Sequence, residues 1–152
     1  MNTNITKTWT IEVNENEVFA RCTNESLYQS YNRMSANPKG DAVVMQEDDK
    51  EQFHSYFSYA IAELSILLAR RMNEPFQYGS ECGDAVFKLY MHDNHDDVVL
   101  PMLNIHCYEF VTRKILEQWY QRDFGSELEK WEINHCLHYR KNPVRRRVRP
   151  LI

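Results

Sequence analysis

The stretch EDDKEQFHSYFSYAIAELSILLARRMN, residues 47–73, decides the fold class of this chain. Its apolar residues recur at helical spacing and form a wide stripe, which consists of Phe53, Tyr56, Phe57, Ala60, Ile61, Leu64, Leu67 and Leu68. The acidic opening suits the positive end of a helix dipole, and Arg70 and Arg71 suit the negative end. The pattern therefore predicts one long amphipathic helix whose stripe lies in the core.

Two elements are expected before this helix. Residues 5–13 alternate between apolar and polar side chains, with Lys7 as the exception on the apolar side, and predict a half-buried strand. Residues 16–34 predict a helix, with Asn14 or Asn16 available as its N-cap. The apolar residues of this helix are Val18, Phe19, Cys22, Leu27, Tyr28, Tyr31 and Met34. Residues 35–41, SANPKGD, predict a loop.

Three further elements are expected after the long helix, which Pro75 ends. Residues 85–91 alternate and predict a second strand able to pair with the first, and residues 97–122 predict a helix. Residues 126–139 predict another helix, with Ser126 as a possible N-cap and Glu129 at the capping-box offset. Its expected apolar contacts are Leu128, Trp131, Cys136, Leu137 and Tyr139. The fold class predicted is mainly α, a compact four-helix bundle with a small two-stranded β element.

Length and composition agree with one globular body. A chain of 152 residues is the size of an ordinary domain, and four glycines with five prolines are too few for disorder or a many-turned β sandwich. The start MNTNITKTW lacks the pattern of a secretory signal, and no apolar run is long enough for a membrane span. We therefore expect a cytoplasmic protein with no membrane partner, whose four widely spaced cysteines are reduced.

Charge divides the chain into two parts. Residues 1–139 hold 12 basic and 22 acidic residues, a net charge of −10, whereas residues 140–152 carry +6 and no acidic residue. The six basic residues are Arg140, Lys141, Arg145, Arg146, Arg147 and Arg149. Pro143 and Pro150 prevent a continuous helix here. We therefore predict a body domain, residues 1–139, and an extended basic C-terminal arm, residues 140–152, whose guanidinium groups bind partners.

The arm has three interpretations. It binds nucleic acid, where each neutralised phosphate releases counterions. Alternatively it binds an acidic protein groove, such as a copy of the chain's own body. A solvated tail that only aids solubility is the third interpretation.

Two groups of potential metal ligands occur, the run HDNHDD at residues 92–97 and the pair His135 and His138 with Cys136, near His106 and Cys107. No spacing matches a zinc finger, a ribbon or a His-Glu-x-x-His helix, and turn formation and helix capping also require Asp and Asn. The chain contains no nucleophile elbow and no glycine-rich phosphate loop. Cys107 has two interpretations: it forms a catalytic pair with His138, or it is a small buried residue of the core. We expect no catalytic residue, metal or cofactor, and a protein that is not an enzyme.

The order of elements carries a resemblance. A strand, a helix, a long helix with an acidic opening, a short strand and a further long helix ending in WYQRD, residues 119–123, are followed by the basic YRKNPVRRRVRP, residues 139–150. This order resembles small structural proteins of tailed phages and prophages. Within that group the chain is most similar to the head–tail connector or adaptor proteins that form rings beneath the portal.

The resemblance implies a virion protein of the neck, assembled in the cytoplasm of the bacterial host. Its partners would be further copies in a homo-oligomeric ring, the portal and tail or neck proteins, with packaged DNA passing close by. The six basic residues would be the partner-binding residues. Connector rings often line the channel with long loops, for which only residues 35–42 and 72–84 are available here. The alternative is a small helical nucleic-acid-binding or regulatory protein that uses the same tail.

Overall fold

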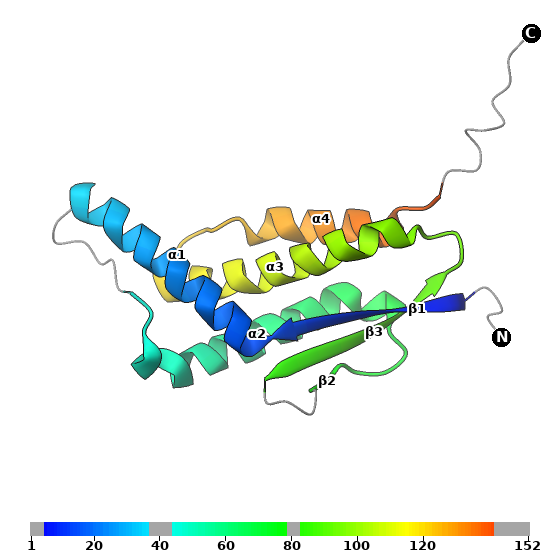
Figure 1. The fold of residues 1–152 in the computed structure, drawn as a ribbon, viewed down its shortest axis with the longest axis horizontal. Coiled ribbons are helices and arrows are strands. Elements are labelled where there is room, and N and C mark those ends of the chain that lie inside the picture. Colours follow the sequence, from blue (N-terminus) through cyan, green and yellow to red (C-terminus); the bar gives the residue numbers. More distant parts are fainter. Residues whose placement is uncertain (1–4, 37–43, 79–82, 142–152) are drawn as a thin grey trace, which may run out of the picture.

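The computed structural model describes residues 5–36, 44–78 and 83–141 (Figure 1). The helices and strands are, in order, β1 (Ile5–Asn14), α1 (Glu15–Ala36), α2 (Lys50–Leu68), β2 (Gln77–Tyr78), β3 (Asp84–His92), α3 (Leu100–Tyr120) and α4 (Ser126–His138). Short 3-10 turns cover Glu47–Asp49, Ala69–Arg71 and Asp97–Val99. The predicted fold class is confirmed, a mainly helical chain with a small antiparallel sheet. The arm beyond Lys141 lies outside the described residues.

The sheet has β3 at its centre and β1 at one edge, in the order β1-β3-β2. β1 pairs with β3, as predicted; the pairing is antiparallel, with a register from Lys7 opposite Met91 to Asn14 opposite Asp84. The two-residue strand β2 was not expected from the sequence, because two residues are too few to show a period. The sheet is therefore a two-stranded ribbon extended by one short strand.

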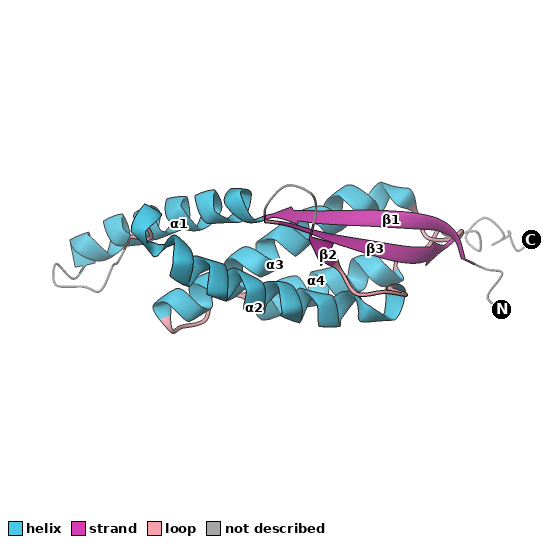
Figure 2. Cartoon of the chain, turned by 90° about the horizontal axis from the view of Figure 1, so that it is seen from below, coloured by secondary structure: helices cyan, strands magenta, loops and turns pink. Residues whose placement is uncertain are grey.

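One face of the sheet packs against the helices (Figure 2). From β1 the buried side chains are Trp9, Ile11 and Val13, and from β3 they are Ala85, Phe87, Leu89 and Met91. Six residues of the stripe predicted at residues 47–73 are buried, namely Phe53, Phe57, Ala60, Ile61, Leu64 and Leu68, whereas Tyr56 and Leu67 are partly buried against the core. On α3, Leu103 and Phe110 are also buried. No helix among the described residues is long and apolar enough to cross a membrane.

Two helices expose apolar side chains that were predicted to be buried. On α1 the exposed residues are Leu27, Tyr28 and Tyr31, and on α4 and at its end they are Leu128, Trp131 and Tyr139. On α4 the predicted contacts Cys136 and Leu137 are buried, together with Ser126, Glu129 and Ile133, which were not predicted. The prediction was wrong because these helices carry apolar residues on two faces, and spacing alone does not tell which face packs.

Several element ends differ from the prediction. The long helix is an α-helix only over Lys50–Leu68, with a 3-10 turn at each end. α1 continues through Ser35 and Ala36, which were expected to be in a loop, and residues 37–41 lie outside the described residues. Asn14 caps α1 as predicted, because its Oδ1 accepts the Glu17 N–H over 2.8 Å. Ser126 is not an N-cap: Gly125, at φ 88°, occupies that position.

Candidate partner-binding site

The root of the basic tail is fixed to the body. Of the six predicted partner-binding residues, Arg140 and Lys141 are described and exposed; Arg145, Arg146, Arg147 and Arg149 lie outside the described residues. Arg140 forms an antiparallel bridge with His95, and the Lys141 N–H donates to the Asn94 carbonyl over 2.7 Å. Arg140 and Lys141, the last described residues, therefore lie against the turn between β3 and α3.

A second guanidinium group lies at this root. Arg71, in the turn after α2, donates from Nη2 to the Leu137 carbonyl at the end of α4 over 3.0 Å. Burial, and then the nearby positive charge of Arg140, lower the pKa of Arg71. The end of α4 is thus tied to the end of α2, and two cations share the surface where the tail begins.

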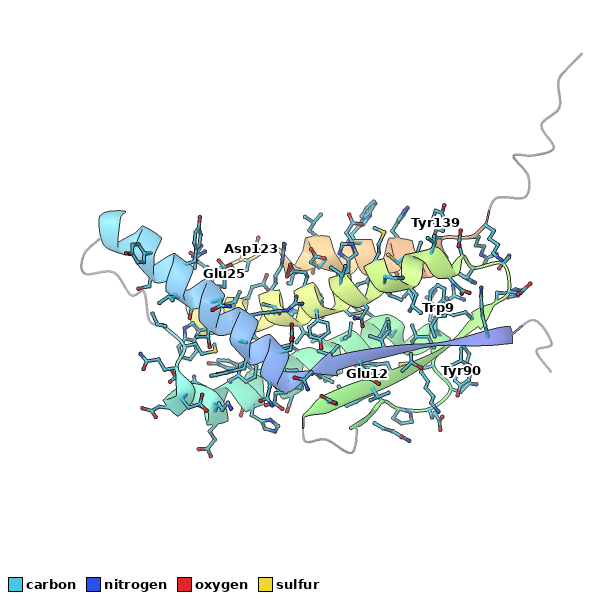
Figure 3. All side chains as sticks on the ribbon, viewed as in Figure 1. Trp9, Glu12, Glu25, Tyr90, Asp123 and Tyr139 are labelled. Carbon is cyan, nitrogen blue, oxygen red and sulfur yellow. The ribbon has the colours of Figure 1, made fainter. Side chains whose placement is uncertain are left out.

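The start of β1 meets the same turn from the other side. Lys7 Nζ lies 2.9 Å from Asp97 Oδ1 and also donates to the His95 carbonyl. Trp9 Nε1 donates to Asp97 Oδ1 over 2.8 Å, and the bonds from Trp9 and Lys7 lower the pKa of Asp97. Trp9 and Tyr139, which follows α4, lie towards the same end of the molecule (Figure 3). The turn therefore connects β1, β3, α3 and the tail.

His95 is buried beneath the tail root. Its Nδ1 lies 3.4 Å from the His92 carbonyl, and its Nε2 is buried without a hydrogen-bond partner among the described residues. Burial, followed by the positive charge of Arg71 and with a smaller contribution from Arg140, lowers the pKa of His95, although the backbone of His92 and, less strongly, that of Leu137 oppose this shift. The surroundings of His95 therefore favour the neutral imidazole over the charged one.

We expect the folded protein to lose stability as the pH falls below about 6.5, the ordinary pKa of histidine. Because the pKa of His95 is lower in the folded chain than in the unfolded chain, the unfolded chain binds more protons between those two values. The stability is complete above the unfolded pKa and decreases as the pH falls towards the folded pKa. Urea unfolding midpoints between about pH 5.5 and 7.5 measure this slope.

The His95→Gln variant is expected to flatten that slope. The matched control is His135→Gln, because His135 is exposed on α4. An unchanged slope in the His95→Gln variant would show that another group causes the pH dependence.

The candidate metal ligands have other roles in the structure. Among residues 5–36, 44–78 and 83–141, no three His, Cys, Asp or Glu side chains are placed to hold a metal ion. Asp96 accepts the Val98 N–H over 3.1 Å and caps the turn before α3, and Asp97 binds Lys7 and Trp9. The acidic residues of this turn therefore serve turn formation and capping.

The potential ligands on α3 and α4 form no group of three among the described residues either. Cys107 lies in the core, where burial raises the pKa of its thiol, whereas His138 is exposed and its Nδ1 lies 2.8 Å from the Asn134 carbonyl. His106 Nδ1 lies 2.6 Å from Glu129 Oε2. The structure therefore does not bring Cys107 and His138 together as a catalytic pair.

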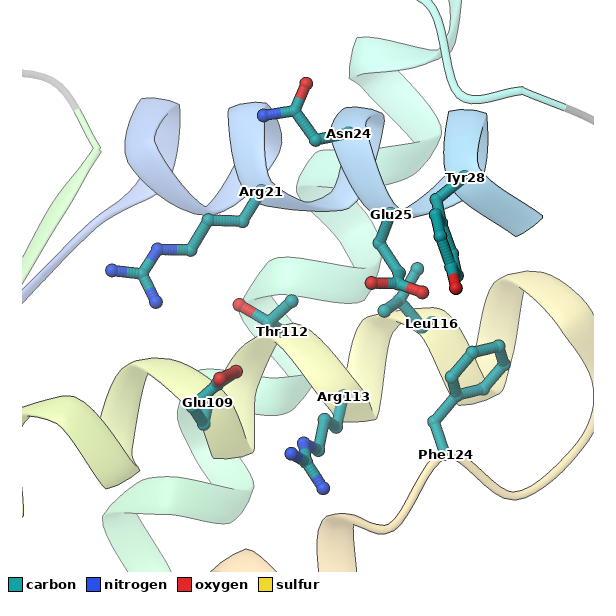
Figure 4. A pocket seen from close by; sticks show the side chains of 9 residues that line it. All are labelled: Arg21, Asn24, Glu25, Tyr28, Glu109, Thr112, Arg113, Leu116 and Phe124. Carbon is teal, nitrogen blue, oxygen red and sulfur yellow. The ribbon is translucent and has the colours of Figure 1, made fainter. Parts of the chain in front are cut away.

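A groove with a volume of about 630 Å³ lies between α1 and α3 (Figure 4). Its lining consists of Arg21, Asn24, Glu25, Tyr28, Glu109, Thr112, Arg113, Leu116 and Phe124. Two carboxylates and two guanidinium groups balance each other, and Arg21 also lies 4.7 Å from the centre of the Tyr108 ring. This lining offers no histidine, cysteine or serine for catalysis. Sequence reasoning missed the groove because its two walls are about ninety positions apart.

Comparison with known proteins identifies no relative of this chain. No family model matches it, no curated protein matches it, and no solved structure matches its fold. The resemblance to connector proteins therefore stays a prediction that rests on the order of elements and on the basic tail.

Proposed function

We propose that this chain is a structural assembly protein of the head–tail connector kind, which forms a ring by binding the basic tail of one copy to the body of the next. The observation that carries the proposal is the anchored root of the tail. Lys141 is bonded to Asn94, and Arg140 is bridged to His95, so the first two residues of the tail have a fixed place on the body. A tail with a fixed origin reaches the same place on each neighbouring copy.

Charge supports binding between copies. The body carries −10 and the tail +6, so the two parts of different copies attract each other. The tail of one copy and the body of the next are different surfaces, so their contact is head-to-tail. Repeated contacts of this kind form a closed ring when the rotation between neighbouring copies divides a full turn evenly. The resemblance adds the surroundings of the proposed ring: the portal above it, tail or neck proteins below it and the DNA channel through it. An acidic body suits such a channel, because it repels passing DNA.

The test compares three full-length or nearly full-length forms. We expect the wild-type chain to form oligomers, and the chain truncated after Lys141 to stay folded but remain monomeric. The cut lies after Lys141 so that its bond to Asn94 is kept. Replacing Arg145, Arg146 and Arg147 with glutamate is expected to weaken assembly more than truncation, because it adds repulsion. Light scattering and electron microscopy measure the outcome, and normal rings from the truncated chain would contradict the proposal.

One observation favours a second function, binding of nucleic acid. Arg71, Arg140 and Lys141 place cations at the root of the tail, which extends the basic surface onto the body. Such a surface would bind duplex DNA with an affinity that falls steeply with salt, while the chain stays monomeric. A salt titration of DNA binding, performed on the same three forms, decides between the two functions.

A further inference from the structure

β1 is an edge strand of the sheet, and the edge that faces away from β3 is a candidate surface for binding another copy. In an antiparallel ladder, residues whose N–H and C=O groups face the partner strand alternate with residues whose groups face away. The Glu15 N–H donates to the Gly83 carbonyl over 3.0 Å and continues the register of β1 with β3, so the odd-numbered residues of β1 face β3. The outward-facing groups therefore belong to Thr8, Thr10, Glu12 and Asn14.

Both ends of this edge are protected. At one end a β-bulge lies between Ile5 and Lys7, and the Lys7 side chain turns inward and is 19% exposed. Bulges and inward charges are devices that protect edge strands against pairing. At the other end the Tyr108 hydroxyl accepts the outward N–H of Asn14 over 2.8 Å. The open part of the edge is residues 8–12, about 17 Å long at strand spacing.

A groove of about 480 Å³ runs beside this open window. Its lining consists of Thr10 and Glu12 from β1 and Leu100, Pro101, Asn104 and Tyr108 from α3. Ile105, one helical turn from Pro101, is exposed on α3. Within the described part of the chain, the window therefore offers backbone groups without a partner, an apolar helix surface and one carboxylate, which together suit an added strand.

We propose that residues 144–149 of a neighbouring copy pair with residues 8–12 of β1 as an additional strand. This inference rests on the proposed function, in which the tail binds another copy, and it names the surface that receives the tail. Residues 144–149, VRRRVR, are the longest run of the tail without proline. Pro143 and Pro150 end this run, because proline cannot donate to a ladder. Six residues extend about 20 Å, which matches the window.

The side chains of this run suit the groove. Alternation in a strand places Arg145, Arg147 and Arg149 on one face and Val144, Arg146 and Val148 on the other. The first face meets Glu12 and the acidic body, and the two valines meet Leu100 and Pro101 of α3. Charge and shape therefore favour the same orientation of the added strand.

The direction of pairing favours the tail of another copy over the chain's own tail. β1 begins at the end of the molecule where α4 ends, so the chain's own tail would enter beside Thr8 and run parallel to β1 (Figure 1). Antiparallel pairing, which the existing sheet uses, is slightly more stable per residue. It requires entry beside Glu12, from a copy placed end to end with the first. This contact repeats from copy to copy, as a ring requires.

Two full-length variants test the proposal, each of which blocks one partner of the contact. Thr10→Pro removes one outward-facing N–H from the edge of β1. It keeps every N–H that β1 donates to β3, because these belong to the odd-numbered residues. Val148→Pro interrupts the added strand and keeps all six charges of the tail. We expect each variant alone to associate roughly a hundredfold more weakly than the wild type in analytical ultracentrifugation. An equal mixture of the two variants is expected to form a complex of two chains, in which the intact tail of Thr10→Pro pairs with the open edge of Val148→Pro. This complex grows no further, because its remaining edge and its remaining tail are both blocked.

The matched controls are Thr10→Val and Val148→Thr, which keep the backbone donors and are expected to assemble as the wild type does. If Val148→Pro assembles normally while the triple glutamate variant does not, the tail acts through charge on another surface. That result overturns the strand pairing and leaves the proposed function in place. A wild-type chain that stays monomeric overturns both.

Hydrogen exchange decides the case in which Thr10→Pro fails to fold. In the assembled wild type the amides of Thr8, Thr10 and Glu12 are expected to exchange at least about tenfold more slowly than in the dilute monomer. Equal rates overturn the inference. The inference is also overturned if these amides exchange slowly in the monomer and the slow exchange is lost when the tail is removed. In that case the tail pairs with β1 of its own chain.

Discussion

Replacing Leu64 with alanine is expected to lower the free energy of unfolding by about 2–5 kcal/mol. Leu64 is fully buried on α2, in line with Phe57, Ile61 and Leu68 on the face that packs into the core. The change removes apolar contacts and leaves a cavity, while alanine keeps the helix itself favourable. Urea unfolding monitored by circular dichroism measures the loss.

The control for this variant is Ile66→Ala on the same helix. Ile66 is 70% exposed and lies two positions from Leu64, on the opposite side of α2. We expect its free energy of unfolding to change by less than about 0.5 kcal/mol. Equal losses at the two positions would show that the register of α2 in the core is different.

Replacing Glu117 with alanine is expected to lower the free energy of unfolding by about 2–3 kcal/mol, because hydrogen bonds to a charged group are among the strongest in proteins. Glu117 Oε2 accepts the N–H groups of Phe124 and Ser126, each over 3.0 Å, and Oε1 accepts the Ser126 hydroxyl over 2.8 Å. The same negative charge lies at the positive end of α4. Without Glu117, the turn between α3 and α4 loses its main polar contact.

Glu127→Ala is the control for this variant. Glu127 lies one residue beyond Ser126, but its side chain is 83% exposed and its Oε1 lies 3.9 Å from Lys130 Nζ. We expect a change of less than about 0.5 kcal/mol in thermal or urea unfolding. A similar loss for Glu117→Ala and Glu127→Ala would mean that helix dipole charge, rather than the three hydrogen bonds, stabilises the start of α4.

The elements with a strong period were predictable from the sequence. The stripe from Phe53 to Leu68 repeats over about four turns of helix. The alternation of β1 and β3 covers most of their length, so burial of one face determines each of these elements. Asn14 was also predictable as a cap, because its contact is local and spans three residues. Local signals therefore gave the fold class.

The contacts that the sequence did not predict join distant residues. Glu117 caps α4 from nine residues away, in place of the local cap expected at Ser126. The tail root depends on Asn94 and His95, which lie 46 and 45 positions before Arg140, and no periodic pattern relates them. The exposed Trp131, with 61% of its surface accessible, shows that an apolar residue on a helix does not by itself locate the core.

The pairing of β1 with β3 has a consequence for synthesis of the chain. Thr8 lies 82 positions before its partner Tyr90, so β1 leaves the ribosome long before the strand that completes it. Through that interval the nascent chain carries Trp9, Ile11 and Val13 without their sheet partners. Closure of so long a loop is slow compared with formation of α1, so translation presents a helix and an unpaired apolar strand to the cell's chaperones.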